Sequence, residues 1–223
     1  MISSIWAFCS ACILSNASGE RSSTDRSNPF TWVQLVNELM ADPNFREHFQ
    51  IWVFTYPTGQ PFVVNAAELR SRLAEVAQQY GANSKGDYLS DVVLVGHSLG
   101  GLVAKLQVAE SKDLLWRSIA NRDFTDVHFP PGRGPVIREA FFFQPSPQVS
   151  RVIYIGTPHG GSNYARRLVG RLGSALVRPS PQNEELHQRM LDCNPGVFTE
   201  EITRGIPTSI DMMEPQSCLL QAI

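Results

Sequence analysis

The sequence predicts an α/β fold, a mostly parallel sheet flanked by helices, and three observations lead to this prediction. The fully apolar run Val92–Val95 has the composition of a strand that is buried on both faces, which is typical of parallel sheets, and Val152–Ile155 is another apolar run of strand type. A third β-rich run covers Ile51–Thr55 and ends at a Tyr-Pro-Thr-Gly turn. Segments with apolar residues at helical spacing separate these strands, and this alternation favours a parallel sheet.

The helices are predicted from this spacing and from the residues at their ends. Asn28-Pro29 has the form of a cap followed by proline at the first helical position, and Asp42-Pro43 is expected to end that helix. Further helices are expected over Phe62–Tyr80, after Ser98, and over Asn183–Leu191.

Other stretches give weaker signals. Residues 112–150 carry several prolines and are expected to be irregular, and a further strand is considered near Ile202–Ile210. The three phenylalanines of Ala140–Val149 fit either a segment entering the core or the lid of an acyl pocket, and we favour the core. The basic segment Tyr164–Arg178 fits a packed helix with solvated arginines better than a helix lying on anionic lipid.

Residues 1–27 form a signal-like or atypical N-terminal segment in this interpretation, and residues 28–223 form a single domain. The apolar core Ile5–Leu14, with small residues after it, has the pattern of a signal peptide. However, no Lys or Arg precedes that core, and it is too short to span a bilayer. The alternatives are a buried strand or a start site that is not the natural one, so location in the cytoplasm or the cell envelope stays open.

Composition excludes some functions. The net charge of −2 gives no general attraction to nucleic acid, so no nucleic-acid partner is expected. Cys9 and Cys12 form a lone C-x-x-C without a second pair at zinc spacing, and no histidine follows it at haem spacing. We therefore expect no metal and no cofactor.

The strongest motif is Gly96-His97-Ser98-Leu99-Gly100, which fits the G-x-S-x-G nucleophile elbow. A buried strand is expected before it and a helix after it, as this motif requires. Ser98 would be the nucleophile, exposed at a tight strand-to-helix turn, with glycines on both sides because a Cβ there would collide with neighbouring backbone. The backbone N–H of Leu99 would be one oxyanion donor.

Two segments, LVGHSLGGLVAK and RVIYIGTPHGGS, together resemble lipase- and esterase-like serine hydrolases of the α/β-hydrolase superfamily. The resemblance is to the bacterial branch related to the GPI-inositol-deacylase and palmitoyl-thioesterase-like lipases, and it covers roughly residues 28–223. It implies an α/β-hydrolase-like sheet, incomplete here at its N- and C-terminal strands, and hydrolysis of carboxylic esters through a Ser98 acyl-enzyme. The implied partner is a small acyl ester or lipid, with contact to a membrane surface left open.

The rest of the catalytic machinery is hard to find. The resemblance implies a base after the last strand of the sheet, beyond the strands that this sequence predicts. It also makes His159 part of a turn lining the pocket, and it puts Asp211 near the position of the acid. The alternative for Asp211 is the cap of a turn. His97, His128 and His187 are weaker candidates for the base, and no His-Gly pair marks a second oxyanion donor before Phe30.

Three functions follow from these observations. The first is a serine ester hydrolase. The second is a truncated or degenerate hydrolase without turnover, and the third is a lipid- or protein-binding module that reuses the pocket.

Overall fold

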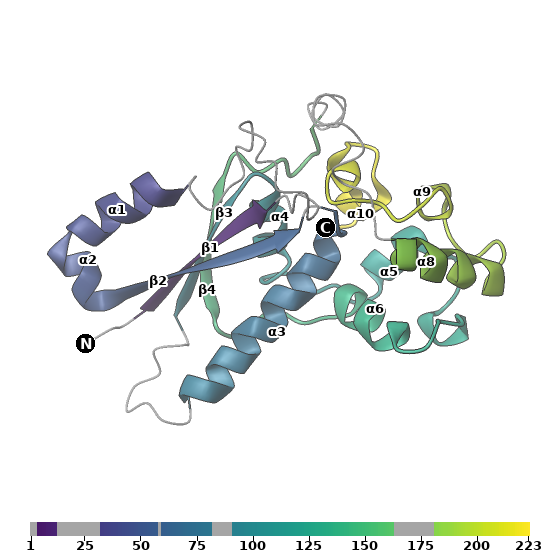
Figure 1. Ribbon diagram of the computed structural model, residues 1–223, viewed down its shortest axis with the longest axis horizontal. Helices are drawn as coiled ribbons and strands as arrows, with labels where there is room; N and C mark the ends of the chain where they lie inside the picture. The colour runs from purple at the N-terminus through teal and green to yellow at the C-terminus, as the bar shows by residue number, and fades with distance from the viewer. Residues whose placement is uncertain (1–3, 13–31, 58, 82–90, 163–180) are drawn as a thin grey trace.

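The computed structural model describes residues 4–12, 32–57, 59–81, 91–162 and 181–223, and over these it is a mixed α/β structure. Its sheet has four parallel strands in the order β2-β1-β3-β4 (Figure 1). The strands are β1 (Ser4–Cys12), β2 (Phe49–Pro57), β3 (Val92–His97) and β4 (Val149–Ile155). The predicted α/β class with a parallel sheet is confirmed.

Strand β1 lies inside the sheet, between β2 and β3. Ile5 pairs with Gln50 on one side and with Val92 on the other. Of the alternatives for the apolar N-terminal run, the structure therefore shows a strand. The other three strands begin and end within a few residues of the predicted runs, and β2 extends through the Tyr-Pro that was expected to start the turn.

The helices near the sheet largely match the sequence pattern. Asp42-Pro43 ends one helix as predicted, but it also begins the next, because the Asp42 carboxylate accepts a hydrogen bond of 2.9 Å from the Asn44 N–H and proline suits the first turn. Asn28 and Pro29 lie outside the described residues. These helices are α1 (Val33–Ala41), α2 (Pro43–His48), α3 (Phe62–Gly81) and α4 (Leu99–Lys105).

A second group of helices gathers beyond one end of the sheet (Figure 1). The expectation of irregular structure over 112–150 was wrong, because two α-helices and a 3-10 turn form there. The strand considered near Ile202–Ile210 was also wrong: Ile202 is buried in a short helix, which a turn at Gly205 follows. The group comprises α5 (Leu114–Ile119), η2 (Phe124–Asp126), α6 (Arg133–Phe141), α8 (Pro181–Cys193), α9 (Glu200–Thr203), η4 (Asp211–Met213) and α10 (Cys218–Gln221).

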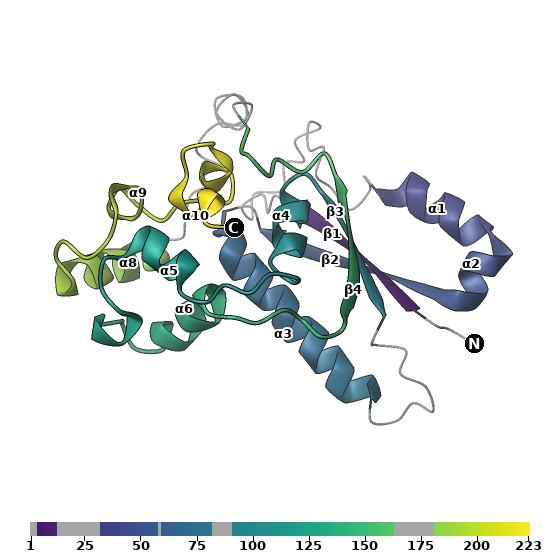
Figure 2. The same ribbon diagram turned by 180° about the vertical axis from the view of Figure 1, so that it is seen from behind.

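One hydrophobic core joins the sheet to this helical group. Phe62 and Leu69 of α3, Leu94 of β3 and Leu102 of α4 belong to the same buried cluster as Trp116 of α5. Figure 2 shows α3 and α4 on one side of the sheet and α1 with α2 on the other. On that other side a small cluster of Trp32 and Val95 is buried.

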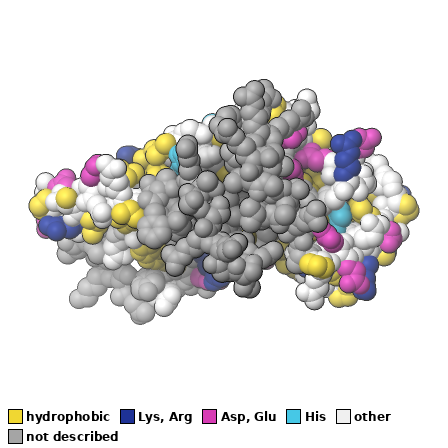
Figure 3. Space-filling view, turned by 45° about the horizontal axis from the view of Figure 1, so that its top comes forward, with side chains coloured by type: hydrophobic (Ala, Val, Ile, Leu, Met, Phe, Trp, Pro, Cys, Tyr) yellow, Lys and Arg dark blue, Asp and Glu magenta, His cyan; other side chains and the backbone are white. Residues whose placement is uncertain are grey.

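The three phenylalanines belong to the core, as favoured. Phe141 is buried at the end of α6, and Phe142 and Phe143 pack partly buried against the main cluster. The basic segment 164–178 lies outside the described residues. None of the described helices is long and apolar enough to cross a membrane. On the face drawn in Figure 3, basic and acidic side chains lie beside one another.

Candidate nucleophile elbow

Ser98 occupies the turn between β3 and α4, and its backbone is strained there. Its φ is 53° and its ψ is −122°, and only Ser98 and Lys112 among the described non-glycine residues have positive φ. Such a conformation costs on the order of 1–3 kcal/mol and persists only where the surroundings enforce it. The Ser98 N–H donates to the Ile155 carbonyl at 2.9 Å, so the end of β4 helps to hold the turn.

Glycines make room for this turn. A Cβ built on Gly96 would lie 2.5 Å from the Gly101 Cα and 2.6 Å from the Gly100 carbonyl oxygen. A Cβ on Gly101 would lie 1.8 Å from the Thr157 Oγ1. The sequence motif identifies Gly96 and Gly100. The motif does not include Gly101, and the sequence marks this residue only as the second glycine of a Gly-Gly pair.

The first amides of α4 follow Ser98 directly in the chain. Gly101 N–H donates back to the Ser98 carbonyl at 3.0 Å. Among the described residues, the N–H groups of Leu99 and Gly100 donate to no backbone carbonyl, as expected for the first residues of a helix. The Leu99 side chain is buried in the core while Ser98 is half-buried. The Leu99 amide therefore lies next to the serine in the chain, and it donates to no backbone carbonyl within the described residues.

The turn after β4 packs against the elbow. Thr157 lies against Gly101, and its buried Oγ1 has no hydrogen-bond partner among the described residues. At its other end the turn contacts η4, since the Ser162 N–H donates to the carbonyl of Met213, the last residue of η4, at 2.9 Å. Gly161, with φ of 85°, approaches Pro215 so closely that a Cβ would lie 2.5 Å from its Cα. Sequence reasoning missed Thr157 as an elbow contact, although it lies only two residues after the end of β4.

His159 lies on this same turn and is exposed. Its ring packs edge-on against Tyr154, with 4.7 Å between the ring centroids. Partial burial lowers the pKa of His159, and the positive charge of Lys105 lowers it further. The neutral form, which a general base requires, is thereby favoured at neutral pH. The structure thus puts His159 near the elbow in the fold, but no hydrogen bond joins it to Ser98 or to a carboxylate among the described residues.

Asp211 closes a local turn. Its carboxylate accepts hydrogen bonds from the Thr208 N–H at 2.9 Å and the Thr208 hydroxyl at 2.8 Å. The Asp211 N–H donates in return to the Thr208 hydroxyl at 3.2 Å, which completes a reciprocal cap at the start of η4. No histidine is among the hydrogen-bond partners of Asp211 in the described part of the chain, so a turn-capping role accounts for the contacts seen.

The weaker candidates for the base have other surroundings. The His97 ring packs edge-on against Trp32, with 6.2 Å between centroids, on the sheet side opposite α3. The backbone of His128 is held by the Asn194 side chain. His187 bonds through Nε2 to the Ile202 carbonyl at 2.8 Å, and burial lowers its pKa. Among the described residues, Ser98 therefore has no histidine hydrogen-bonded to it.

Comparisons with known proteins do not place this chain in a family. No protein-family model matches the sequence, and no curated protein matches it. Within the described residues, no group of three or more His, Cys, Asp or Glu side chains could hold a metal ion. The geometry of the elbow is therefore the main basis for a functional assignment.

Proposed function

We propose that the protein is a serine hydrolase of carboxylic esters, with an α/β-hydrolase-type fold and Ser98 as its nucleophile. The observation that supports this most strongly is the strained backbone of Ser98 between a buried parallel strand and a helix, with Gly96 and Gly101 in near contact. An incidental serine in a turn has no need of such strain. A nucleophile elbow needs it, because it turns the hydroxyl outward at the end of the sheet.

The reaction would proceed in two steps. The Ser98 Oγ attacks the ester carbonyl carbon, its proton passes to a base, and the oxyanion accepts a hydrogen bond from the Leu99 N–H. Collapse of this intermediate breaks the ester C–O bond, the base returns its proton to the leaving oxygen, and the alcohol departs from an acyl-serine. Water then attacks the acyl-serine, which releases the carboxylic acid and restores the hydroxyl.

His159 is the histidine that we assign to the surroundings of Ser98. It shares a short turn with Thr157, which touches the elbow, and its lowered pKa favours the form able to accept a proton. Asp211 belongs to the segment packed against the far end of that turn. Its carboxylate is occupied by Thr208, so we give it no role in proton transfer.

A fluorophosphonate probe tests the nucleophile. We expect the native protein to be labelled at Ser98, the Ser98→Ala variant to remain unlabelled, and the matched control Ser118→Ala to be labelled like the wild type. Heat-denatured protein should lose labelling, because the reactivity comes from the folded turn. Absence of labelling in the native wild type would contradict the proposal.

A second candidate is a pocket that binds or acylates without turnover, either in a degenerate hydrolase or in a binding module. It is favoured by one observation: in the described part of the chain, no histidine is hydrogen-bonded to Ser98. Hydrolysis of p-nitrophenyl butyrate separates the two functions. Steady turnover that is abolished by Ser98→Ala supports the hydrolase, whereas labelling without turnover supports the second candidate.

A further inference from the structure

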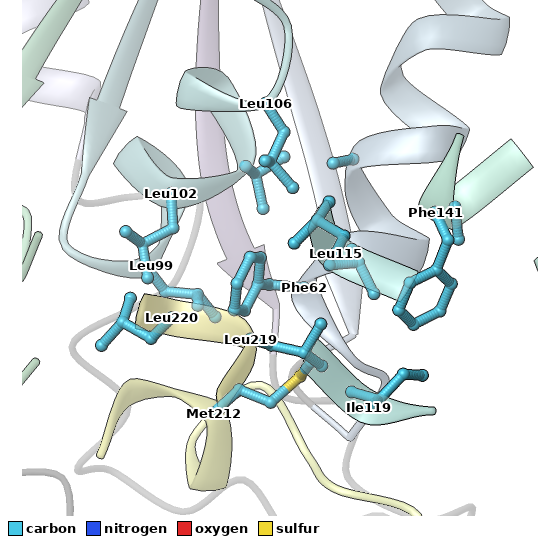
Figure 4. Packing of buried hydrophobic residues seen from close by; sticks show 14 of the residues in the cluster. Phe62, Leu99, Leu102, Leu106, Leu115, Ile119, Phe141, Met212, Leu219 and Leu220 are labelled. Carbon is cyan, nitrogen blue, oxygen red and sulfur yellow. The ribbon is translucent and has the colours of Figure 1, made fainter. Parts of the chain in front are cut away.

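A cavity of about 130 Å³ lies within the helical group, away from the elbow. Its walls come from α3, α5, α6, α8, α9, α10 and the residues that lead into η4. They include Val64, Trp116, Ile137, Met190 and Leu219. No residue of the elbow or of the turn over residues 157–162 lines it. In Figure 4, Leu99 and Leu220 lie on one side of Met212 and Leu219, while Ile119 and Phe141 lie on the other.

The walls of this cavity are almost wholly apolar. His187 is the one titratable side chain that lines it, and its Nε2 is already bonded to the Ile202 carbonyl at 2.8 Å. Burial lowers the pKa of His187, so its neutral form is favoured at neutral pH. The cavity is partly open to solvent, and a water molecule inside it gains few hydrogen bonds from these walls. Among the described residues that line it, no side chain is charged, so none recognises an ionic head group.

An apolar cavity of roughly 150 Å³ is known to admit benzene, and a hydrocarbon gains free energy when it moves from water onto apolar walls. We propose that this cavity is a binding site for a hydrocarbon group of about six carbon atoms, a small ring or the end of an alkyl chain. The hydrocarbon could be a free molecule or part of a larger ligand. This proposal does not depend on Ser98 being a nucleophile.

Benzene is the probe that tests the site, with thermal unfolding as the readout. A ligand that binds only the folded state raises the melting temperature. For a chain of this size, we expect a rise of about 2–4 °C at roughly five times the dissociation constant. Because this measurement needs no catalysis, it succeeds or fails separately from the assignment of Ser98.

Two neighbouring residues of α6 give a matched pair of variants. Ile137 is half-buried and lines the cavity, whereas Val136 is exposed, with 44% of its surface accessible. Ile137→Phe should fill part of the space and abolish the benzene shift, while Val136→Phe should keep it. If Ile137→Phe does not fold, Val64→Phe, which enters the cavity from α3, takes its place.

Two results would overturn the proposal: no benzene shift in the wild type, or a shift of equal size in the filled variants. The effect of benzene on p-nitrophenyl hexanoate hydrolysis then separates the sources of hydrocarbon. If benzene competes with the ester in the wild type but not in the filled variant, the cavity binds part of the ester. Binding without any effect on hydrolysis supports a site for a separate molecule.

Discussion

At the scale of single residues, the elbow is the part of the site that the sequence identifies best. Ser98 and Gly96 are fixed by a five-residue motif whose geometry is local, so the sequence is sufficient to predict them. Gly101 and Thr157 escape prediction because their contact joins residues far apart in the chain. Asp211 could be interpreted from sequence in two ways, and its short-range bonds to Thr208 show only the local one.

The close approach at the elbow predicts which glycines tolerate a methyl group. Gly96→Ala and Gly101→Ala should each lower the free energy of unfolding by about 1–3 kcal/mol, because each new Cβ meets fixed neighbours. Gly160→Ala is the control: nothing lies within 4 Å of its built Cβ, so its effect should stay within about 0.5 kcal/mol. Urea unfolding measures all three. Equal stability of the three variants would contradict the close packing of the elbow glycines.

At the scale of elements, long helices and apolar strands were predictable, and short helices were not. The 20-residue helix α3 repeats its apolar face often enough to be recognised. The helix α5 has six residues, and α6 starts at a left-handed Gly132 with a proline in its first turn, so neither shows a sustained period. Their stability comes from tertiary packing around Trp116, which local sequence does not reveal.

Arg70 links three of these elements. Its guanidinium donates to the Leu106 carbonyl after α4 at 3.3 Å and to the Glu139 carbonyl of α6 at 2.8 Å. It also lies 3.8 Å from the centroid of the Phe143 ring. Burial lowers the pKa of Arg70 to about 10, and the charge of Glu139 partly offsets this, so the side chain remains charged at neutral pH.

Removing this guanidinium should therefore destabilise the packing of α3 against α4 and α6. Arg70→Met, which keeps an apolar stem, should lower the free energy of unfolding by about 1–3 kcal/mol, since two carbonyls lose a charged donor. Arg72 on the same helix makes only exposed ion pairs with Glu68 and Glu75, so Arg72→Met should cost less than about 1 kcal/mol. Chemical denaturation of the two variants provides the measurement. If Arg72→Met lowered the free energy of unfolding more than Arg70→Met does, the linking role of Arg70 would be contradicted.

At the scale of the whole molecule, the sequence does not predict the position of β1. It also does not predict that the sheet and the helical group share a core. Strand β1 pairs with β2 and β3, which follow it by dozens of residues, and no local pattern specifies such neighbours. The apolar run Ile5–Leu14 could equally be a strand or a signal-like segment until its partners were known. Likewise, nothing in the sequence shows that the helices beyond the sheet share its core.

That shared core predicts that the sheet and the helical group unfold together. Leu106, after α4, and Ala120, after α5, are both buried, and their amides donate to Leu102 and Trp116 carbonyls. In native-state hydrogen exchange, these two amides should open with free energies that agree within about 1 kcal/mol, because both require the global transition. The amide of Thr203, which is exposed at the end of the short helix α9, should exchange much faster.

Leu219→Ala sharpens this test, because Leu219 is buried in α10 and belongs to the shared cluster. Its truncation should lower the free energy of unfolding by about 2–5 kcal/mol. If the core is one cooperative unit, protection at Leu106 and at Ala120 falls by the same factor, although Leu106 follows a helix packed on the sheet. If protection against exchange falls at the Ala120 amide but not at the Leu106 amide, the helical group opens without the sheet. The elbow would then be held by the sheet alone, and the cavity beyond it would belong to a separately opening unit.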